Sequence, residues 1–390
     1  MRTPRTTAYY LAAVPFVSII VNVTFLSAIY IATKDLKAKT WQLGLLGACV
    51  TGIYALFCPI FGRLLRGVDT KPKAIAVCLM YILLCVTVPW AHGFWLLLGL
   101  VMLLSLAGAI YWPMMEGVAC EGRMRSSIRR NLGTYNVLWS VGLTCGTLLA
   151  GRLYDLGSHW PFHVCACIAL ALLVLFVVTP SPHAPEEEEA AARNAEHTDE
   201  DVQRELANSF LYLSKVLVFL AYFTFGSLRS LFPKYGEGLG FSATTISVLL
   251  FVVVLAQTGI FLLFRNTGFW HYRFWPLLLA TAGAGVSFFV IGSTSNELLL
   301  VVPLLCVGIF VGCSYFSSLY YSMSRDNAGV ESAAWHEMTL GMGSTFGPIV
   351  GGLFAQHADS VTAPFVLSGV AAVIGFGITA QFLLRRPCRF

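Results

Sequence analysis

The residues best suited to chemistry in this chain are a few ionisable side chains set within long apolar stretches. His336 and Glu337 are adjacent near the start of one stretch, Glu116 lies toward the end of another, and Arg229 lies in a third. Ionisable groups are costly to bury in apolar surroundings, so each of them is a candidate for a functional role. A carboxyl next to an imidazole can take up and release protons. Glu337 and His336, with Glu116 as a second acid, are therefore the candidates for proton coupling or gating.

Uncharged polar and aromatic side chains in the same stretches could bind a small organic molecule. Amide groups suit hydroxyl or amide partners, and flat aromatic faces suit sugars, aromatic solutes and cations. Because buried charges are few, a multiply charged ligand is disfavoured and a neutral or singly charged organic molecule is expected. The candidate ligand-contacting residues are Asn22, Tyr111, Trp112, Asn136, Trp139, Arg229, Gln257, Tyr315 and Trp335.

Signatures of enzymes and of metal or cofactor sites are missing from the sequence. The chain has no GxxxxGK[ST] phosphate-binding loop. His336-Glu337 begins like a zinc-protease motif, but Leu340 stands where the second histidine belongs. Cys165 and Cys167 are two residues apart, so on a helix they would point to different sides and make a poor metal pair. We therefore expect no enzymatic activity, no metal and no cofactor.

The composition predicts an all-α integral membrane protein. The chain is 57% hydrophobic and 12% charged, roughly half the charged fraction of a soluble domain. A bilayer crossing needs about 20 mostly apolar residues, and twelve such runs occur, six on each side of a polar break. The predicted spans are residues 8–31, 42–62, 73–91, 94–118, 132–154, 160–179, 209–232, 243–264, 275–292, 297–321, 333–354 and 361–384.

One segment of the first half recurs in the second half. RRNLGTYNVLWSVGLTCGTLLAGRLYD aligns without gaps to VESAAWHEMTLGMGSTFGPIVGGLFAQ. Parallel repeats of membrane helices, with a binding site between them, are typical of transporters, and transport is therefore the first functional hypothesis. The aligned glycines are Gly142 with Gly343, Gly146 with Gly347 and Gly151 with Gly352.

The polar break divides the chain into two predicted six-helix bundles related by pseudo-symmetry. Residues 1–179 form the first bundle, 180–208 an acidic cytoplasmic linker, and 209–390 the second bundle. The linker holds nine acidic residues against two arginines. Blocks of like charge are usually solvated, and a partner-binding or regulatory role is the alternative.

The distribution of basic residues predicts the orientation in the membrane. With both termini and the linker in the cytoplasm, eighteen Lys and Arg residues lie on that side and five on the other. Cytoplasmic loops are enriched in Lys and Arg, so this orientation is predicted, in the plasma (cell inner) membrane. The net charge of +5 then reflects these loops and does not indicate nucleic-acid binding.

These features together resemble the major facilitator superfamily, over essentially the whole chain. The most specific piece is GMGSTFGPIVGG, from Gly341 to Gly352, which is similar to the family's glycine-proline helix motif. It lies in the eleventh span, whereas the family's antiporters carry it in the fifth, where this chain has Thr147. The resemblance implies a central cavity lined by spans 4, 5, 10 and 11. It also implies a gating latch between spans 2 and 11, although Arg66 replaces the family's acid and Asp69 follows three residues later.

The glycine-rich segments predict close helix packing. Small residues four apart let two backbones approach in lipid, where helices have no hydrophobic drive to associate. Pro348 removes one backbone hydrogen bond and favours a kink. Packing is favoured over direct substrate contact, and a hinge role is compatible with both. The packing and hinge candidates are Gly142, Gly146, Gly343, Gly347, Pro348 and Gly351.

Each ionisable candidate also has a structural interpretation. Glu337 or Glu331 could form a lock with a loop arginine such as Arg325 or Arg130. Glu116 could form an ion pair at the membrane edge. Arg229 could extend to the outer interface, or it could attract an anionic substrate group. The amide candidates could equally form hydrogen bonds between helices.

The sequence therefore predicts a secondary active transporter that works by alternating access. It would move a small neutral or singly charged organic solute, coupled to protons through Glu337 with His336 beside it. The alternatives are a non-transporting membrane protein of the same fold, acting as a sensor or assembly partner, and a flippase for lipids or other amphiphiles. The expected partners are the solute, H+ and membrane lipid, and the chain is expected to be a monomer.

Overall fold

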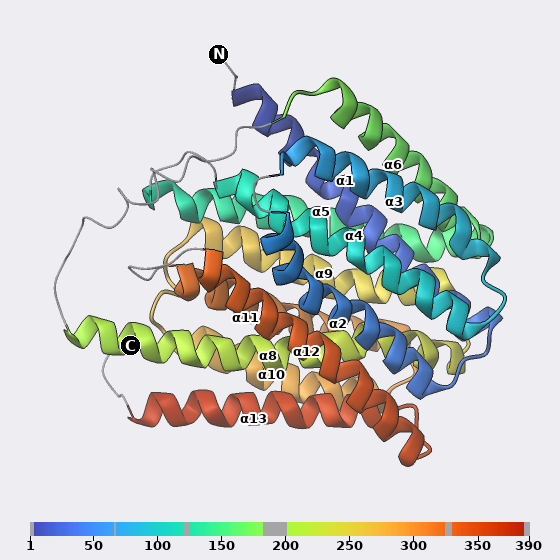
Figure 1. Cartoon of the computed structure of the whole chain (residues 1–390). Helices are drawn as coiled ribbons and strands as arrows, with labels where there is room; N and C mark the ends of the chain where they lie inside the picture. Colours follow the sequence, from blue (N-terminus) through green and yellow to red (C-terminus); the bar gives the residue numbers. More distant parts are fainter. Residues whose placement is uncertain (1–3, 66–67, 121–124, 182–200, 324–329, 386–390) are drawn as a thin grey trace.

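The computed structural model of the chain is a bundle of long helices that run roughly side by side, with both termini at one end (Figure 1). It describes residues 4–65, 68–120, 125–181, 201–323 and 330–385. The helices are α1 (Pro4–Tyr30), η1 (Ile31–Asp35), α2 (Thr40–Leu64), α3 (Thr70–Thr87), η2 (Val88–Trp90), α4 (Phe94–Cys120), α5 (Arg125–Leu156), α6 (Trp160–Val178), α8 (Asp201–Gly238), α9 (Ala243–Asn266), α10 (Trp275–Ser293), α11 (Glu297–Met323), α12 (Val330–His357) and α13 (Ala363–Arg385).

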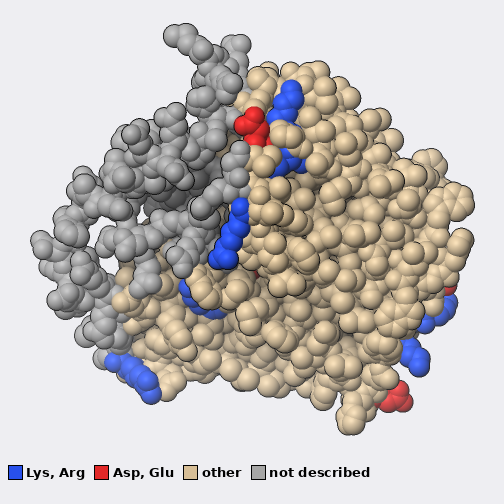
Figure 2. Space-filling view, in the orientation of Figure 1, with Lys and Arg blue, Asp and Glu red and all other residues tan. Residues whose placement is uncertain are grey.

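Twelve helices among the described residues are long and apolar enough to cross a membrane. The helical fold class and the twelve predicted spans are thereby confirmed. Charged side chains lie near the two ends of the bundle, and a belt without them runs between (Figure 2). Large apolar side chains are also exposed within the membrane helices, such as Leu79 of α3 and Val286 of α10, by 52% and 67%. Such a belt matches the hydrocarbon layer of a bilayer.

The structure differs from the predicted boundaries most clearly at α8. This helix begins at Asp201, inside the range predicted as linker, and continues through Pro233 to Gly238. The first difference arises because a polar segment, here residues 201–208 with two acids and one arginine, can be helical while remaining too polar to score as a span. The second arises because a proline inside a membrane helix is tolerated when neighbouring groups satisfy the carbonyl that it leaves free.

The glycine pairs of the repeated segment lie at equivalent helix contacts in the two halves. α5 packs against α1, and α12 packs against α8. A Cβ atom at Gly142 would lie 2.2 Å from the Pro15 carbonyl oxygen, and one at Gly343 would lie 2.4 Å from that of Phe219. Real Cβ atoms do not approach oxygen so closely, so the helix backbones touch where only glycine fits.

The two halves meet along α2 with α12 and along α5 with α9. Glycines bring backbones together here too: a Cβ at Gly44 would lie 2.3 Å from Pro348 O, and one at Gly151 would lie 2.2 Å from Ala243 O. Pro348 has no N–H, so the carbonyl of Ser344 loses its helical partner. The Thr51 hydroxyl of α2 lies 3.0 Å from that carbonyl oxygen and can donate to it. A hydrogen bond between the halves can therefore take the place of the one lost within α12, although the Gly47 carbonyl of α2 lies equally close to the Thr51 hydroxyl.

Gly347→Ala should destabilise the protein strongly, because the added Cβ would lie 1.9 Å from the Phe223 carbonyl oxygen. Overpacking of this kind costs about 1–3 kcal/mol. The control is Gly259→Ala in α9, where a Cβ would meet nothing within 4 Å; it should leave stability unchanged or raise it, since alanine favours helix. Thermal unfolding in detergent compares the two. Equal melting temperatures for both variants would contradict the packing role of Gly347.

Candidate functional site

Asn22 of α1 links three helices through its fully buried amide. Its Nδ2 donates to the Leu143 carbonyl at 2.9 Å and to Thr147 Oγ1 at 2.6 Å, both in α5. Its Oδ1 accepts a hydrogen bond from the guanidinium of Arg229 in α8. The amide therefore connects the first half to the second near the middle of α1.

Arg229 points into the bundle. It does not extend to the outer interface, which was the structural interpretation suggested by its position near a helix end. Its guanidinium lies over the rings of Phe25 and Phe225, 4.7 and 5.4 Å from their centroids. The side chain is partly buried. Among the described residues, no carboxylate forms an ion pair with it; the ion pairs found there join Lys37 and Lys234 to Glu237.

Tyr315 of α11 is the centre of an aromatic group to which both halves contribute. Trp139 of α5 stacks on it at 5.9 Å, and Phe261 of α9, Tyr222 of α8 and His336 of α12 lie 5.2, 5.9 and 5.0 Å away. We call these five residues the Tyr315 cluster. Trp139, Tyr315 and His336 were candidates from the sequence, whereas Tyr222 and Phe261 were not. Tyr222 could have been found, because it lies two helical turns before Arg229 and so on the same face of α8.

Several buried polar atoms near this interface have no hydrogen-bond partner among the described residues. They are both amide atoms of Gln257, Nδ2 of Asn136, the Tyr222 hydroxyl and Nε2 of His336. An unsatisfied buried polar group costs about 1–3 kcal/mol, so these atoms are suited to contact with a polar solute.

His336 and Glu337 face different surroundings although they are adjacent in α12. His336 is fully buried, and its Nδ1 lies 3.0 Å from the Ser318 hydroxyl of α11. Glu337 is partly buried, and the Tyr54 hydroxyl of α2 donates to its Oε2 at 3.4 Å. Glu337 therefore contacts the opposite half. The side chains of Arg130 and Arg325, its predicted lock partners, lie outside the described residues.

The remaining candidates from the sequence are not part of the Tyr315 cluster. Tyr111 is fully buried and packs edge-to-face on Trp112 in the same helix at 5.1 Å. Trp335 is 50% exposed. The side chain of Glu116 lies outside the described residues. Asp69, a possible latch acid, is exposed at the start of α3. No group of three or more potential metal ligands occurs in the described part of the chain.

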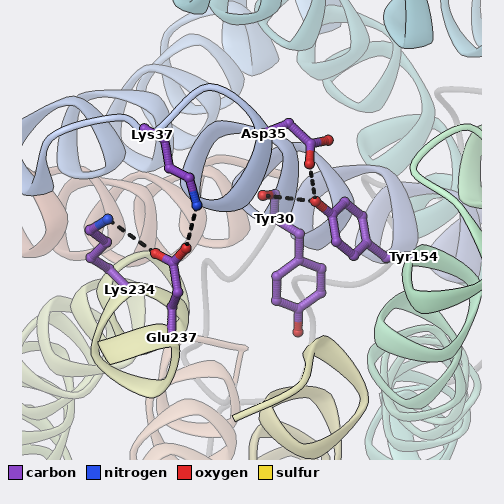
Figure 3. A network of polar contacts seen from close by, with 6 residues as sticks. All are labelled: Tyr30, Asp35, Lys37, Tyr154, Lys234 and Glu237. Atoms are coloured by element: carbon purple, nitrogen blue, oxygen red, sulfur yellow. Dashed lines mark hydrogen bonds and ion pairs between the residues drawn. The ribbon is translucent and has the colours of Figure 1, made fainter. Parts of the chain in front are cut away.

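A second set of contacts joins the halves at the end of the bundle that carries η1, which we call the η1 end (Figure 3). Glu237 of α8 accepts from Lys37 of the first half at 3.2 Å and from Lys234 at 3.1 Å. The Tyr154 hydroxyl donates to Asp35 at 2.7 Å and keeps the first half's own helix ends together.

The first turn of α9 is bound by the first half at the same end. Asp155 of α5 accepts from the Thr244 backbone N–H at 2.8 Å and from its hydroxyl at 2.6 Å. The Tyr30 and Ser247 hydroxyls lie 2.7 Å apart, which adds a bond between α1 and α9. A carboxylate at a helix N-terminus is favoured both by the free N–H groups and by the helix dipole.

The sequence model of the Major Facilitator Superfamily matches residues 11–335 of the chain. The chain belongs to this superfamily. It is therefore a multi-pass membrane protein of a transporter family, and not of an enzyme family, as the sequence predicted. A curated relative, "Multidrug resistance protein 1" of Bacillus subtilis (strain 168), is 25% identical over 259 residues. That match covers 64% of this chain and 63% of the relative, so the chain spans less than two thirds of the relative's length.

Solved structures of other transporters in the superfamily share the fold. A nucleoside transporter aligns with a TM-score of 0.69 at 12% identity, over 97% of this chain and 99% of its own. A structure reported for substrate recognition in proton-dependent oligopeptide transporters aligns at 0.73 and 13% identity, over 98% and 100%. A bacterial homologue of the human lysosomal transporter Spinster, inward-facing and unoccupied, aligns at 0.66 and 17%, over 98% and 97%. At these identities the likeness establishes the fold alone.

Asn22→Leu should lower stability, because Arg229 loses its hydrogen-bond acceptor and Thr147 loses the donor from α1. Leaving such groups unpaired costs about 1–3 kcal/mol. Thr24→Val is the matched control, since the Thr24 hydroxyl bonds only within α1, to Ile20 at 2.7 Å and Val21 at 3.1 Å. Melting temperatures in detergent measure the difference. If Asn22→Leu melts no lower than Thr24→Val, Asn22 does not hold the three helices together.

Proposed function

We propose that this chain is a secondary active transporter that moves a small organic solute, neutral or singly charged, by alternating access. The observation that carries the proposal is the convergence of both halves on one polar and aromatic site. α1 and α5 contribute Asn22 and Trp139, while α8 and α11 contribute Arg229 and Tyr315. When the halves move relative to each other, a solute bound between them would be exposed first to one side of the membrane and then to the other, which is alternating access.

Proton coupling is assigned to Glu337. Its carboxylate is partly buried in α12 and accepts a hydrogen bond from Tyr54 of the opposite half. Protonation would remove the charge and weaken this bond between the halves. A proton at Glu337 can thereby favour one arrangement of α2 and α12 over the other. His336 is the neighbouring residue in α12. It is buried, bonds to Ser318 and belongs to the Tyr315 cluster.

The contacts at the η1 end support a state that is closed at that end. Asp155 binds the first turn of α9, and Lys37 pairs with Glu237, so each half holds the other. Alternating access requires these bonds to break when that end opens. With the linker and termini in the cytoplasm, as the Lys and Arg distribution favours, the closed end would face outward from the plasma membrane. We expect the transporter to act as a monomer with lipid around its apolar belt.

Glu337→Gln should abolish solute uptake driven by a proton gradient while preserving solute exchange. Glutamine keeps the size and hydrogen-bonding capacity of the side chain but cannot carry or release a proton. The variant and the wild type are reconstituted in vesicles, and labelled aromatic solutes taken up by the wild type are used in both assays. Gradient-driven uptake should fall at least tenfold, and counterflow without a gradient should fall less than twofold. Unchanged gradient-driven uptake would eliminate Glu337 as the coupling residue.

Asp155→Ala should loosen the η1 end. The first turn of α9 would lose the acceptor of the Thr244 N–H and hydroxyl. Loss of a side-chain acceptor at a helix N-terminus costs about 1 kcal/mol. Exchange of the amides that become accessible when this turn opens should therefore be roughly fivefold faster. Hydrogen–deuterium exchange of the peptides at the start of α9 measures the effect. Glu297→Ala is the control, because Glu297 is an exposed acid at the start of α11, at the same end. Equal exchange in the two variants would contradict a closing role for Asp155.

A further inference from the structure

We propose that the solute is an aromatic monocarboxylate whose carboxylate binds Arg229. The proposal rests on the transport function proposed above and specifies the chemistry of the same site. It requires a cation with free donors, a fixed orientation for that cation, and an apolar surface beside it for a ring. The following observations provide these in turn.

The guanidinium of Arg229 has donors to spare. An arginine side chain carries five N–H groups in a planar fork that matches a carboxylate in two-point geometry. Among the described residues, Arg229 donates one hydrogen bond, to Asn22 Oδ1. Arg229 is only partly buried, and its remaining donors form no hydrogen bond among the described residues.

Asn22 fixes the guanidinium without neutralising it. Its Nδ2 already donates to Leu143 and Thr147, which leaves Oδ1 as the atom turned to Arg229. Reversing the amide would place donors against donors, so the hydrogen bonds define its orientation. The acceptor is neutral, and the positive charge of Arg229 therefore remains available to an anion.

An uncompensated cation inside a bundle of membrane helices is costly and usually marks a functional site. The described residues place no carboxylate in an ion pair with Arg229. Glu337 adjoins His336, which contacts Tyr315 as Tyr222 does, so the acid lies beside the Tyr315 cluster. A single negative charge on the solute would balance Arg229 while Glu337 exchanges its proton.

A row of aromatic rings leads from Arg229 into the Tyr315 cluster. Phe225 lies under the guanidinium and packs edge-to-face on Tyr222 at 5.9 Å. Tyr222 is 5.9 Å from Tyr315, which stacks on Trp139 at 5.9 Å. Aromatic pairs at such separations attract each other beyond the effect of their buried area. A planar ring attached to the carboxylate could lie along this row.

Benzoate, benzamide and acetate separate the two requirements. Benzoate has both the charge and the ring, benzamide lacks the charge, and acetate lacks the ring. Purified full-length protein is titrated with each at constant ionic strength, and the rise in melting temperature reports binding, because a ligand that binds only the folded state stabilises it. Benzoate should reach its half-maximal effect at a concentration at least tenfold lower than either of the others. Absence of stabilisation by benzoate, or equal potency of benzamide, would overturn the proposal.

Arg229→Gln should raise the half-maximal benzoate concentration at least tenfold. The matched control is Arg152→Gln, which removes the same charge from an exposed position in α5 and should leave benzoate binding unchanged. A second variant, Asn22→Asp, keeps Arg229 but gives it a carboxylate within the protein, which should exclude benzoate to a similar extent. If both site variants bind benzoate like the wild type, Arg229 is not the anion site.

The binding assay needs neither a membrane nor a proton gradient, so it can fail while Glu337 still couples transport. Conversely, loss of benzoate binding in Arg229→Gln together with normal gradient-driven uptake in Glu337→Gln would remove the coupling assignment and leave the anion site intact. The two proposals are therefore tested separately.

Discussion

Direct contact between helix backbones is the constraint on which the rest of this structure depends. At Gly142 and Gly343 a side chain would overlap the carbonyl of the neighbouring helix, and at Gly44 and Gly151 it would overlap a helix of the other half. In lipid there is no hydrophobic drive to bring helices together, so small residues allow dispersion contacts that larger side chains would prevent. The central site exists because these contacts set α1, α5, α8 and α12 at short, fixed separations.

The repeat uses the same helix position for two different hydrogen-bonding tasks. Thr147 of α5 aligns with Pro348 of α12. Thr147 accepts from Asn22 and so binds α5 to α1 within the first half. Pro348 frees the Ser344 carbonyl, which the Thr51 hydroxyl can bind from the other half. One copy therefore strengthens its own bundle, while the other provides a polar contact at the interface that would have to move in the proposed transport cycle.

The number and type of helices were predictable because span length and hydropathy are local properties of the sequence. The glycine contacts were also accessible, since the repeat places Gly142 and Gly343 in register. The partner of Arg229 was not predictable, because its position near the end of an apolar run favoured the outer interface. Only the packing of α8 against α1 brings the guanidinium to Asn22. Tyr222 was missed for a similar reason, since a tyrosine in an apolar run resembles ordinary core.

Comparison of the two halves explains why the site carries one positive charge and not two. Gly142 meets Pro15 where Gly343 meets Phe219, and Gly146 meets Ile19 where Gly347 meets Phe223. These contacts align α1 with α8, and the same alignment pairs position 25 of α1 with position 229 of α8. Phe25 is therefore the counterpart of Arg229, and the two side chains touch. A second arginine at position 25 would repel the first at this distance. An aromatic ring instead supports one cation from its face. The asymmetry between the halves thus allows one positive charge at an interface that symmetry alone would leave either uncharged or doubly charged.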